Sequence, residues 1–244
     1  MWDDPTLLRN SSSMLLLLSL ALVLYGAAHY LVHMPQLLPL QQIKLSAATK
    51  QVDERDVLQV VREKVQGNLF TVDIEQLRKV LEQLPWVRGV QIRREFPGSL
   101  LVEIEEHQAL AHWNEDELVN QQGEVFSAES DAELPDFIGQ SGDAALVAQQ
   151  YAQFSGQLAP IGLRIQQLVE SPRHAWQLRI DNGMVLELGS AQMQQRLDRF
   201  VSVYPYSLAK MQGEVKTVDL RYRNGFAVSG LNKQSNGRAV ESER

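Results

Sequence analysis

The longest run of apolar residues lies near the start of the chain, from Met14 to Val32, and it leaves no polar face when wound into a helix. No Asp, Glu, Lys or Arg side chain occurs between Arg9 and Lys44. A helix needs about 20 apolar residues to cross a hydrocarbon core of about 30 Å, because each residue rises about 1.5 Å. We therefore expect a transmembrane anchor over residues 11–34.

Two other interpretations of this run stay open. The small residues Gly26-Ala27-Ala28 would suit a signal peptidase, so the run could be a cleaved signal peptide. It could also be a buried core helix, although such helices usually keep a polar face. Arg9 precedes the run and the next basic residue is Lys44, which favours an N-terminus in the cytoplasm with residues 1–10 as a short tail. Both the anchor and the signal peptide place residues 35–244 outside the cytoplasm.

Residues 35–106 show strand and helix periodicities in turn. A short alternating stretch at 43–47 predicts a strand. Two stretches with apolar residues at helical spacing follow Asp53 and Asp73, which are both typical N-cap residues. Two more alternating stretches flank the turn signal Pro97-Gly98. The predicted order is strand, helix, helix, strand, strand, which makes a small α+β module.

The rest of the ordered chain, residues 107–231, is richer in strand patterns. Two hairpin turns are indicated by Asp181-Asn182-Gly183 and Asn224-Gly225, because Asn and Gly accept the positive φ that tight turns require. The strands expected on either side of these turns are 176–180, 184–188, 215–222 and 226–229.

Two segments of this second region have helical spacing instead. They are 147–158 and a later stretch with Met193, Leu197 and Phe200 on one face. The fold class expected for the whole chain is therefore α+β, with one N-terminal transmembrane helix, a small α+β module and a β-rich domain with two helices. Residues 232–244 are polar and are expected to form a flexible tail.

Composition and motifs restrict the classes of function open to this protein. The 244 residues carry a net charge of −7, which argues against a nucleic-acid surface, and the absence of cysteine fits an exported protein without disulfides. The sequence has no G-x-S-x-G or H-E-x-x-H motif. His29 and His33 would share a helix face, but they lack a third ligand nearby. We expect no catalytic residue, no cofactor and no metal site.

One segment carries a specific resemblance. The sequence LPWVRGVQIRREFPGSLLVEIEEHQALAHW, residues 84–113, joins an LPW helix end, a basic strand, an F-P-x-x-L turn and a final x-E-H-x-x-x-A-x-W. This combination resembles the bacterial cell-division protein family FtsQ. Residues 176–178, 196–200 and 218–222 also look like that family, and the order of tail, anchor and two further modules fits it.

The resemblance implies a fold and a role. Residues 35–106 would be a POTRA domain and residues 107–231 the family's β-domain. The protein would be a non-enzymatic member of the divisome in the bacterial inner membrane, with its bulk in the periplasm at the division septum. It would bind FtsB and FtsL there and link early with late cell-division proteins.

The last strand is the expected contact surface. A strand at a sheet edge offers unpaired N–H and C=O groups that a partner strand can complete. In the family FtsB adds a strand at this place, which makes the final strand, with Phe226 and Val228, part of the expected site. The positions implied by the resemblance are Arg173, Tyr222, Asn224 and Gly225.

Each of these residues also has a simpler interpretation. Tyr222 could be an ordinary strand residue, Arg173 a solvated surface charge, and Asn224-Gly225 only a turn. At the level of the whole protein, two alternatives remain. One is an envelope chaperone of the POTRA type, although such proteins usually repeat the module and end in a barrel. The other is a periplasmic enzyme.

Overall fold

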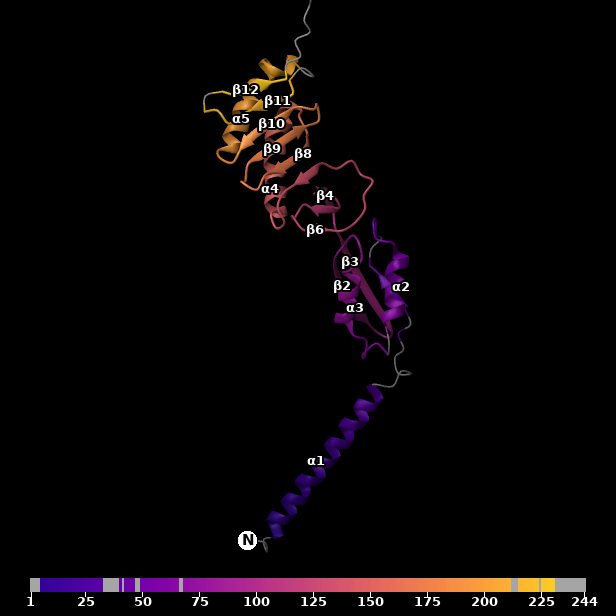
Figure 1. Ribbon diagram of the computed structural model, residues 1–244. Coiled ribbons are helices and arrows are strands. Elements are labelled where there is room, and N and C mark those ends of the chain that lie inside the picture. Colours follow the sequence, from indigo (N-terminus) through magenta and orange to yellow (C-terminus); the bar gives the residue numbers. More distant parts are fainter. Residues whose placement is uncertain are drawn as a thin grey trace, which may run out of the picture. The chain divides into compact units, whose positions relative to one another are not determined.

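The computed structural model of the chain describes residues 5–32, 40, 42–46, 49–65, 68–211, 215–223 and 225–230. The chain divides into two compact units, Met1–His107 and Gln108–Arg244. Figure 1 shows the elements of each unit in chain order. The expected α+β class, with a long first helix followed by an α+β module and a β-rich region, is confirmed.

The first helix, α1, spans Pro5–Val32. Within it, the 19 residues from Ser13 to Leu31 have a mean hydropathy of 1.9, and their side chains are all exposed. A segment of this length rises about 29 Å as a helix, which matches the thickness of a hydrocarbon core. By length and composition α1 can therefore cross a membrane. His33, expected to share a face with His29, lies outside the described residues.

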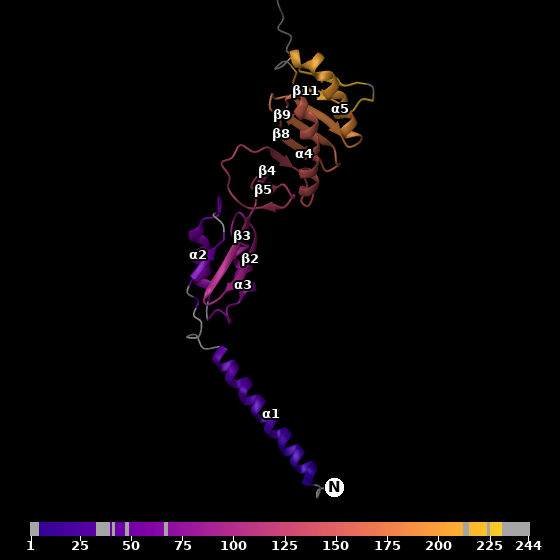
Figure 2. The ribbon, with the colours of Figure 1, turned by 180° about the vertical axis from the view of Figure 1, so that it is seen from behind.

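The α+β module after α1 has the predicted order of elements. Its three strands form a sheet in the order β1-β3-β2, with β1 parallel and β2 antiparallel to the central strand. Figure 2 shows the two helices beside this sheet. The elements are β1 Gln42–Leu45, α2 Glu54–Lys64, α3 Ile74–Leu81, β2 Val87–Glu95 and β3 Ser99–Glu106.

Local signals set the helix starts in this module. The side chain of Asp53 accepts a hydrogen bond from the Arg55 backbone N–H at 2.8 Å, and that of Asp73 accepts one from the Gln76 backbone N–H at 3.0 Å. Both contacts satisfy N–H groups that a helix leaves without a partner at its first turn. The helices bury apolar side chains against one face of the sheet, and the shared core is formed by Val57, Val61, Leu77, Leu81, Leu100 and Val102.

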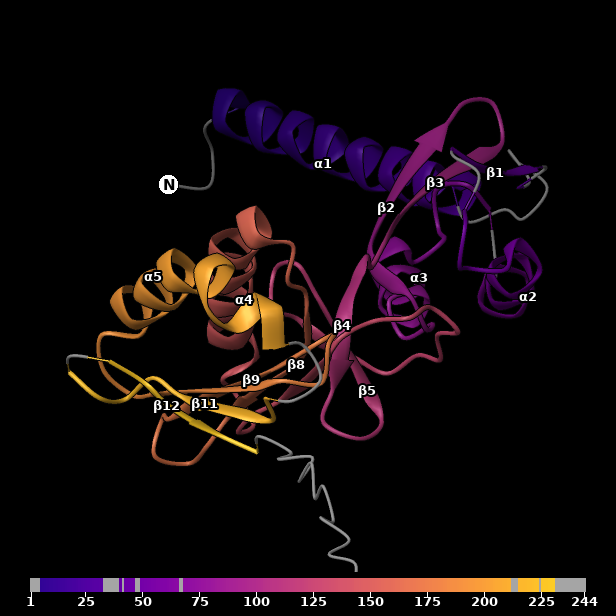
Figure 3. The same cartoon turned by 90° about the horizontal axis from the view of Figure 1, so that it is seen from above.

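The second unit is built on a nine-stranded sheet in the order β12-β11-β10-β9-β8-β7-β4-β5-β6. Figure 3 shows its two main helices, α4 (Ala144–Leu158) and α5 (Met193–Val203), on the same face of this sheet. The strands are β4 Ala109–Trp113, β5 Glu117–Asn120, β6 Val125–Phe126, β7 Asp136–Ile138, β8 Ile165–Glu170, β9 Trp176–Ile180, β10 Val185–Gly189, β11 Thr217–Asp219 and β12 Ala227–Ser229.

The helices are held to the sheet by large apolar side chains. Phe154 of α4 and Phe200 of α5 are fully buried, and the ring of Phe154 meets that of Trp176 edge-on with centroids 6.0 Å apart. These residues belong to one continuous core that runs under both helices. Burying a side chain of this size stabilises the fold by about 1.5–3 kcal/mol. The two helices are therefore held firmly on the sheet, and this packing sets the positions of the strands beneath them.

The last two strands are shorter than the sequence pattern predicts. β11 ends at Asp219, and β12 begins at Ala227. The cause is local, because the Asp219 carboxylate accepts a hydrogen bond from the Arg221 backbone N–H at 3.0 Å. A side chain that bonds the backbone two residues ahead competes with the ladder and favours a turn.

Candidate partner-binding edge

Strand β12 is the outermost strand of the large sheet. It pairs antiparallel with β11, with Val228 opposite Val218, and no strand within the described residues pairs with its outer side. Ala227 and Ser229 are exposed, whereas Val228 is half-buried and packs against the core. The strand therefore presents an exposed edge of the kind that another chain can extend.

The strand register brings distant segments to one end of the sheet. Trp176 at the start of β9 pairs with Gly189 at the end of β10. Asp219 at the end of β11 pairs with Ala227 at the start of β12. Strands β10 and β11 are parallel, so both end on the same side of the sheet. That side also holds the turn between β8 and β9 and the segment between β11 and β12. Neighbouring strands lie about 4.8 Å apart, so roughly 14 Å separates β9 from β12 across the sheet.

Two of the predicted contact residues expose their side chains at this end. Arg173 lies in the turn between β8 and β9 and is exposed. The side chain of Tyr222 is also exposed, at 58%. The backbone carbonyl of Tyr222 accepts a hydrogen bond from Arg199 Nη1 of α5 at 3.1 Å, which holds the main chain of this segment. Gly225 is half-buried, and Asn224 lies outside the described residues.

The other two predicted residues point into the protein. The ring of Phe226 lies edge-on to the ring of Phe200, with centroids 6.4 Å apart. Val228 packs against the same core. These two side chains thus hold β12 to the core, and what β12 offers outward is its backbone and the small side chains of Ala227 and Ser229.

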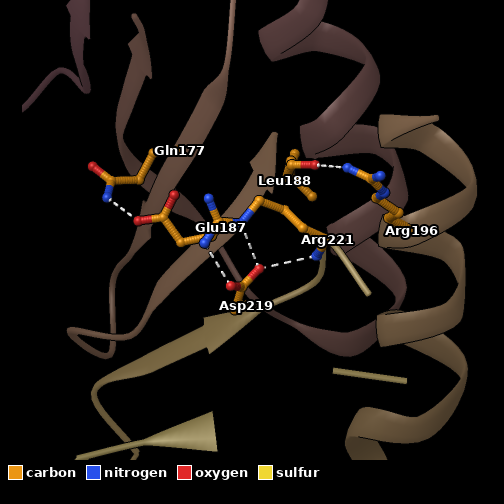
Figure 4. A network of polar contacts seen from close by, with 6 residues as sticks. All are labelled: Gln177, Glu187, Leu188, Arg196, Asp219 and Arg221. Atoms are coloured by element: carbon orange, nitrogen blue, oxygen red, sulfur yellow. Dashed lines mark hydrogen bonds and ion pairs between the residues drawn. The ribbon is translucent and has the colours of Figure 1, made fainter. Parts of the chain in front are cut away.

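A polar network lies directly beside this edge (Figure 4). The Asp219 carboxylate accepts hydrogen bonds from Arg221 Nε at 2.8 Å and Nη2 at 2.6 Å. Beside it, Gln177 of β9 donates a hydrogen bond to Glu187 of β10 at 2.5 Å. The bonds from Arg221 lower the pKa of Asp219 below its ordinary value, although partial burial acts in the opposite direction. The ion pair between Asp219 and the two guanidinium nitrogens of Arg221, called the Asp219–Arg221 fork below, therefore fixes the backbone between β11 and Tyr222.

A second arginine fixes the end of β10. Arg196 of α5 donates to the backbone carbonyl of Leu188. The next residue, Gly189, has φ of 71°, and a Cβ atom there would lie 3.0 Å from Arg196 Nη1 and 3.2 Å from Arg221 Cγ. Only glycine lets both arginines approach this closely without strain. The sequence pattern alone gives these residues no role, although the D-x-R spacing at the end of a predicted strand is a usable signal.

The arrangement defines a class of protein. A helix long enough to cross a membrane precedes a small module of POTRA type and a β-rich domain with an exposed edge strand. The POTRA domain of FtsQ type matches residues 38–107, and the C-terminal domain of cell-division protein FtsQ/DivIB matches residues 111–221.

The chain is similar to several FtsQ proteins over most of its length. The chain is 37% identical over 235 residues to cell division protein FtsQ of Nitrosospira multiformis, covering 94% of this chain and 99% of that protein. It is 36% identical over 235 residues to FtsQ of Burkholderia pseudomallei, covering 93% and 94%. With FtsQ of Shewanella oneidensis it shares 35% identity over 210 residues, covering 85% and 80%. The chain belongs to the FtsQ/DivIB family of cell-division proteins.

Proposed function

We propose that the protein is a non-enzymatic scaffold of the divisome whose strand β12 binds the periplasmic part of FtsB and, with it, FtsL. In this role it links early and late cell-division proteins during septum formation. The observation that carries the proposal is the position of β12 as the outermost strand of a nine-stranded sheet. The family membership supports a role in cell division.

Strand addition explains how such an edge would bind. Main-chain hydrogen bonds supply affinity to any extended segment, and side chains beside the edge select the partner. Tyr222 offers an exposed aromatic ring of the kind enriched at binding hot spots. Arg173 has no ion pair among the described residues, so its guanidinium is available to bind a partner carboxylate in a fork that lysine would not reproduce.

The other parts of the chain have separate roles in this proposal. Helix α1 is an uncleaved inner-membrane anchor with the N-terminus in the cytoplasm, and it holds the remaining chain at the septum. Residues 35–106 act as the POTRA domain and residues 107–231 carry the partner-binding edge. The tail from residue 232 is dispensable for binding. Recovery of a mature protein that begins near His29 would show a cleaved signal peptide instead.

Binding of the full-length chain in nanodiscs to the periplasmic parts of FtsB and FtsL tests the proposal. Val228→Pro removes the N–H of β12 that points away from β11, because its neighbours Ala227 and Ser229 are the residues that pair with the β12-facing residues of β11. This variant should abolish binding while the circular dichroism spectrum is unchanged. Phe226→Pro is a poorer choice, because Phe226 precedes the strand and packs on Phe200. Full binding by the folded Val228→Pro variant would contradict strand addition at β12.

Side-chain variants with matched controls test the rest of the surface. Tyr222→Ala and Arg173→Glu should each weaken binding. Tyr206→Ala, which removes a tyrosine that is 83% exposed elsewhere in the same unit, and Arg179→Glu on β9 should not. If Tyr222→Ala and Arg173→Glu leave the affinity unchanged, the partner binds at another surface.

A further inference from the structure

Three potential metal ligands from separate elements meet in the second unit. Asp143 stands just before α4, Glu170 is the last residue of β8, and His174 lies in the turn between β8 and β9. A carboxylate oxygen from each acid and a ring nitrogen of the histidine all lie within 4.8 Å of one another. The closest pair is His174 Nδ1 and Glu170 Oε1, at 2.7 Å.

Glu170 gives an independent reason to expect a cation. Its side chain is fully buried, with 0% of its surface exposed, yet within the described residues Oε2 has no hydrogen-bond partner. Buried carboxylate oxygens are almost always satisfied, because leaving one without a partner costs free energy. The unsatisfied oxygen belongs to the carboxylate that His174 contacts, so a cation bound between these groups would compensate it.

The turn holds the histidine in place. The His174 backbone N–H donates to the Ser171 carbonyl at 2.8 Å, and the Ser171 N–H donates to the Ala175 carbonyl at 2.9 Å. The His174 side chain remains 63% exposed, which leaves solvent access to the cluster. A cation could therefore enter from water and keep a water molecule as a further ligand.

We propose that Asp143, Glu170 and His174 bind one divalent transition-metal cation of the Zn²⁺ type. Zn²⁺ takes imidazole nitrogen at about 2.0–2.1 Å and carboxylate oxygen at about 2.0–2.2 Å, usually with four ligands. Small side-chain rotations would bring the three groups to these distances. The imidazole selects against Mg²⁺ and Ca²⁺, which favour sites made of oxygen ligands only. The bound cation joins the start of α4 to the β8–β9 turn.

Isothermal titration calorimetry of the full-length chain with ZnCl₂ tests this site. The protein is purified in detergent without a polyhistidine tag and is treated with a chelator beforehand. We expect one saturable site per chain. His174→Ala and Glu170→Gln should each weaken the affinity at least about tenfold, since even outer ligand-supporting groups typically contribute 10- to 100-fold.

Two controls test whether other histidines of the chain bind the metal. His112→Ala removes a half-buried histidine of the same unit, and His29→Ala removes one from α1. Both should bind Zn²⁺ like the parent protein. The proposal is overturned if the parent shows no one-to-one binding, or if His174→Ala binds as tightly as the parent. Because His174 is exposed, that variant remains informative even if Glu170→Gln does not fold.

Discussion

The carboxylate of Glu106, the last residue of β3, accepts a hydrogen bond from the backbone N–H of Val52 at 2.8 Å. The same carboxylate accepts the N–H groups of Gln51 at 2.9 Å and Lys50 at 3.0 Å. Three consecutive backbone donors therefore converge on one acidic side chain. This contact ties the segment that enters α2 to the end of the sheet, across a separation of 54 residues in sequence.

The Glu106 contact makes the stability of the POTRA module depend on pH. Burial alone would raise the pKa of Glu106, but the three hydrogen bonds and the charge of Lys50 outweigh it, so the pKa lies below 4.5. The pKa of this carboxyl is lower in the folded protein than in the unfolded chain. At a pH above the unfolded-state pKa the carboxylate therefore stabilises the fold, and this stabilisation is lost as the pH falls through the folded-state pKa. We expect Glu106→Gln to lower the stability near neutral pH and to weaken its dependence on pH below 4.5.

Urea unfolding of the full-length chain in detergent, followed between pH 3 and pH 7, measures this effect. Glu105→Gln is the matched control, because Glu105 is exposed and pairs with Arg88 at the protein surface. Identical pH profiles for the parent and Glu106→Gln would show that the carboxylate does not hold residues 50–52.

Arg94 has a structural role that its neighbour Arg93 lacks. Its Nε donates to the Leu69 carbonyl at 2.7 Å and its Nη2 to the Val72 carbonyl at 3.0 Å, so it holds the loop between α2 and α3. Hydrogen bonds to charged groups contribute about 1.5–3 kcal/mol each, and partial exposure reduces that here. We expect Arg94→Ala to lower the free energy of unfolding by about 1–3 kcal/mol.

Chemical denaturation monitored by circular dichroism checks this value against Arg93→Ala. Arg93 is 64% exposed and contacts Glu103 at 3.7 Å, so its removal should change stability by less than about 0.5 kcal/mol. Equal effects of the two substitutions would contradict the role given to Arg94.

The glycines at positions 189 and 156 should respond in opposite ways to alanine. Gly189 has φ of 71° and two arginine side chains pack against it, so Gly189→Ala should destabilise the second unit by about 1 kcal/mol or more.

Gly156 is exposed in α4. A Cβ atom added there would have no described atom within 4 Å apart from the backbone of its own helix. Gly156→Ala should therefore stabilise the unit by about 0.5–1 kcal/mol. Thermal unfolding of both variants gives the signs directly, and the same sign for both would refute the argument.

The sequence predicted the first module well because its signals are local. Asp53 and Asp73 start the helices, and Pro97-Gly98 turns the last two strands, as the structure confirms. The parallel pairing of β1 with β3 could not be predicted in this way, because it joins residues 42–45 to 99–102. Likewise, the hairpin turn at Asp181-Asn182-Gly183 was predicted correctly, since β9 and β10 pair antiparallel on either side of it. The nine-stranded order that makes β12 an edge was not predicted.

Side-chain contacts explain what pattern reasoning missed at the site. The alternating pattern continues to Tyr222, but the bonds between Asp219 and Arg221 end β11 three residues earlier. Phe226 and Val228 looked like surface positions of a final strand, whereas the burial of Phe200 draws them toward the core. The cluster of Glu170 with Asp143 arises only when α4 is placed on the sheet.

The Asp219–Arg221 fork should control how well the edge strand binds its partner. Asp219→Asn removes the charge that holds Arg221 and loosens the backbone next to Tyr222, without changing the core. If FtsB binds at β12 as proposed, the affinity should fall about three- to tenfold, which corresponds to roughly 0.7–1.4 kcal/mol. Biolayer interferometry with the full-length chain in nanodiscs measures the change.

Asp181→Asn is the matched control for this fork. Asp181 also pairs with an arginine, Arg164, at 3.1 Å, but it follows β9 and so lies at the opposite end of the sheet from Asp219. This variant should bind like the parent chain. A loss of affinity in both variants would indicate a general effect of charge, and no loss in either would mean that the fork stabilises the fold without shaping the binding edge.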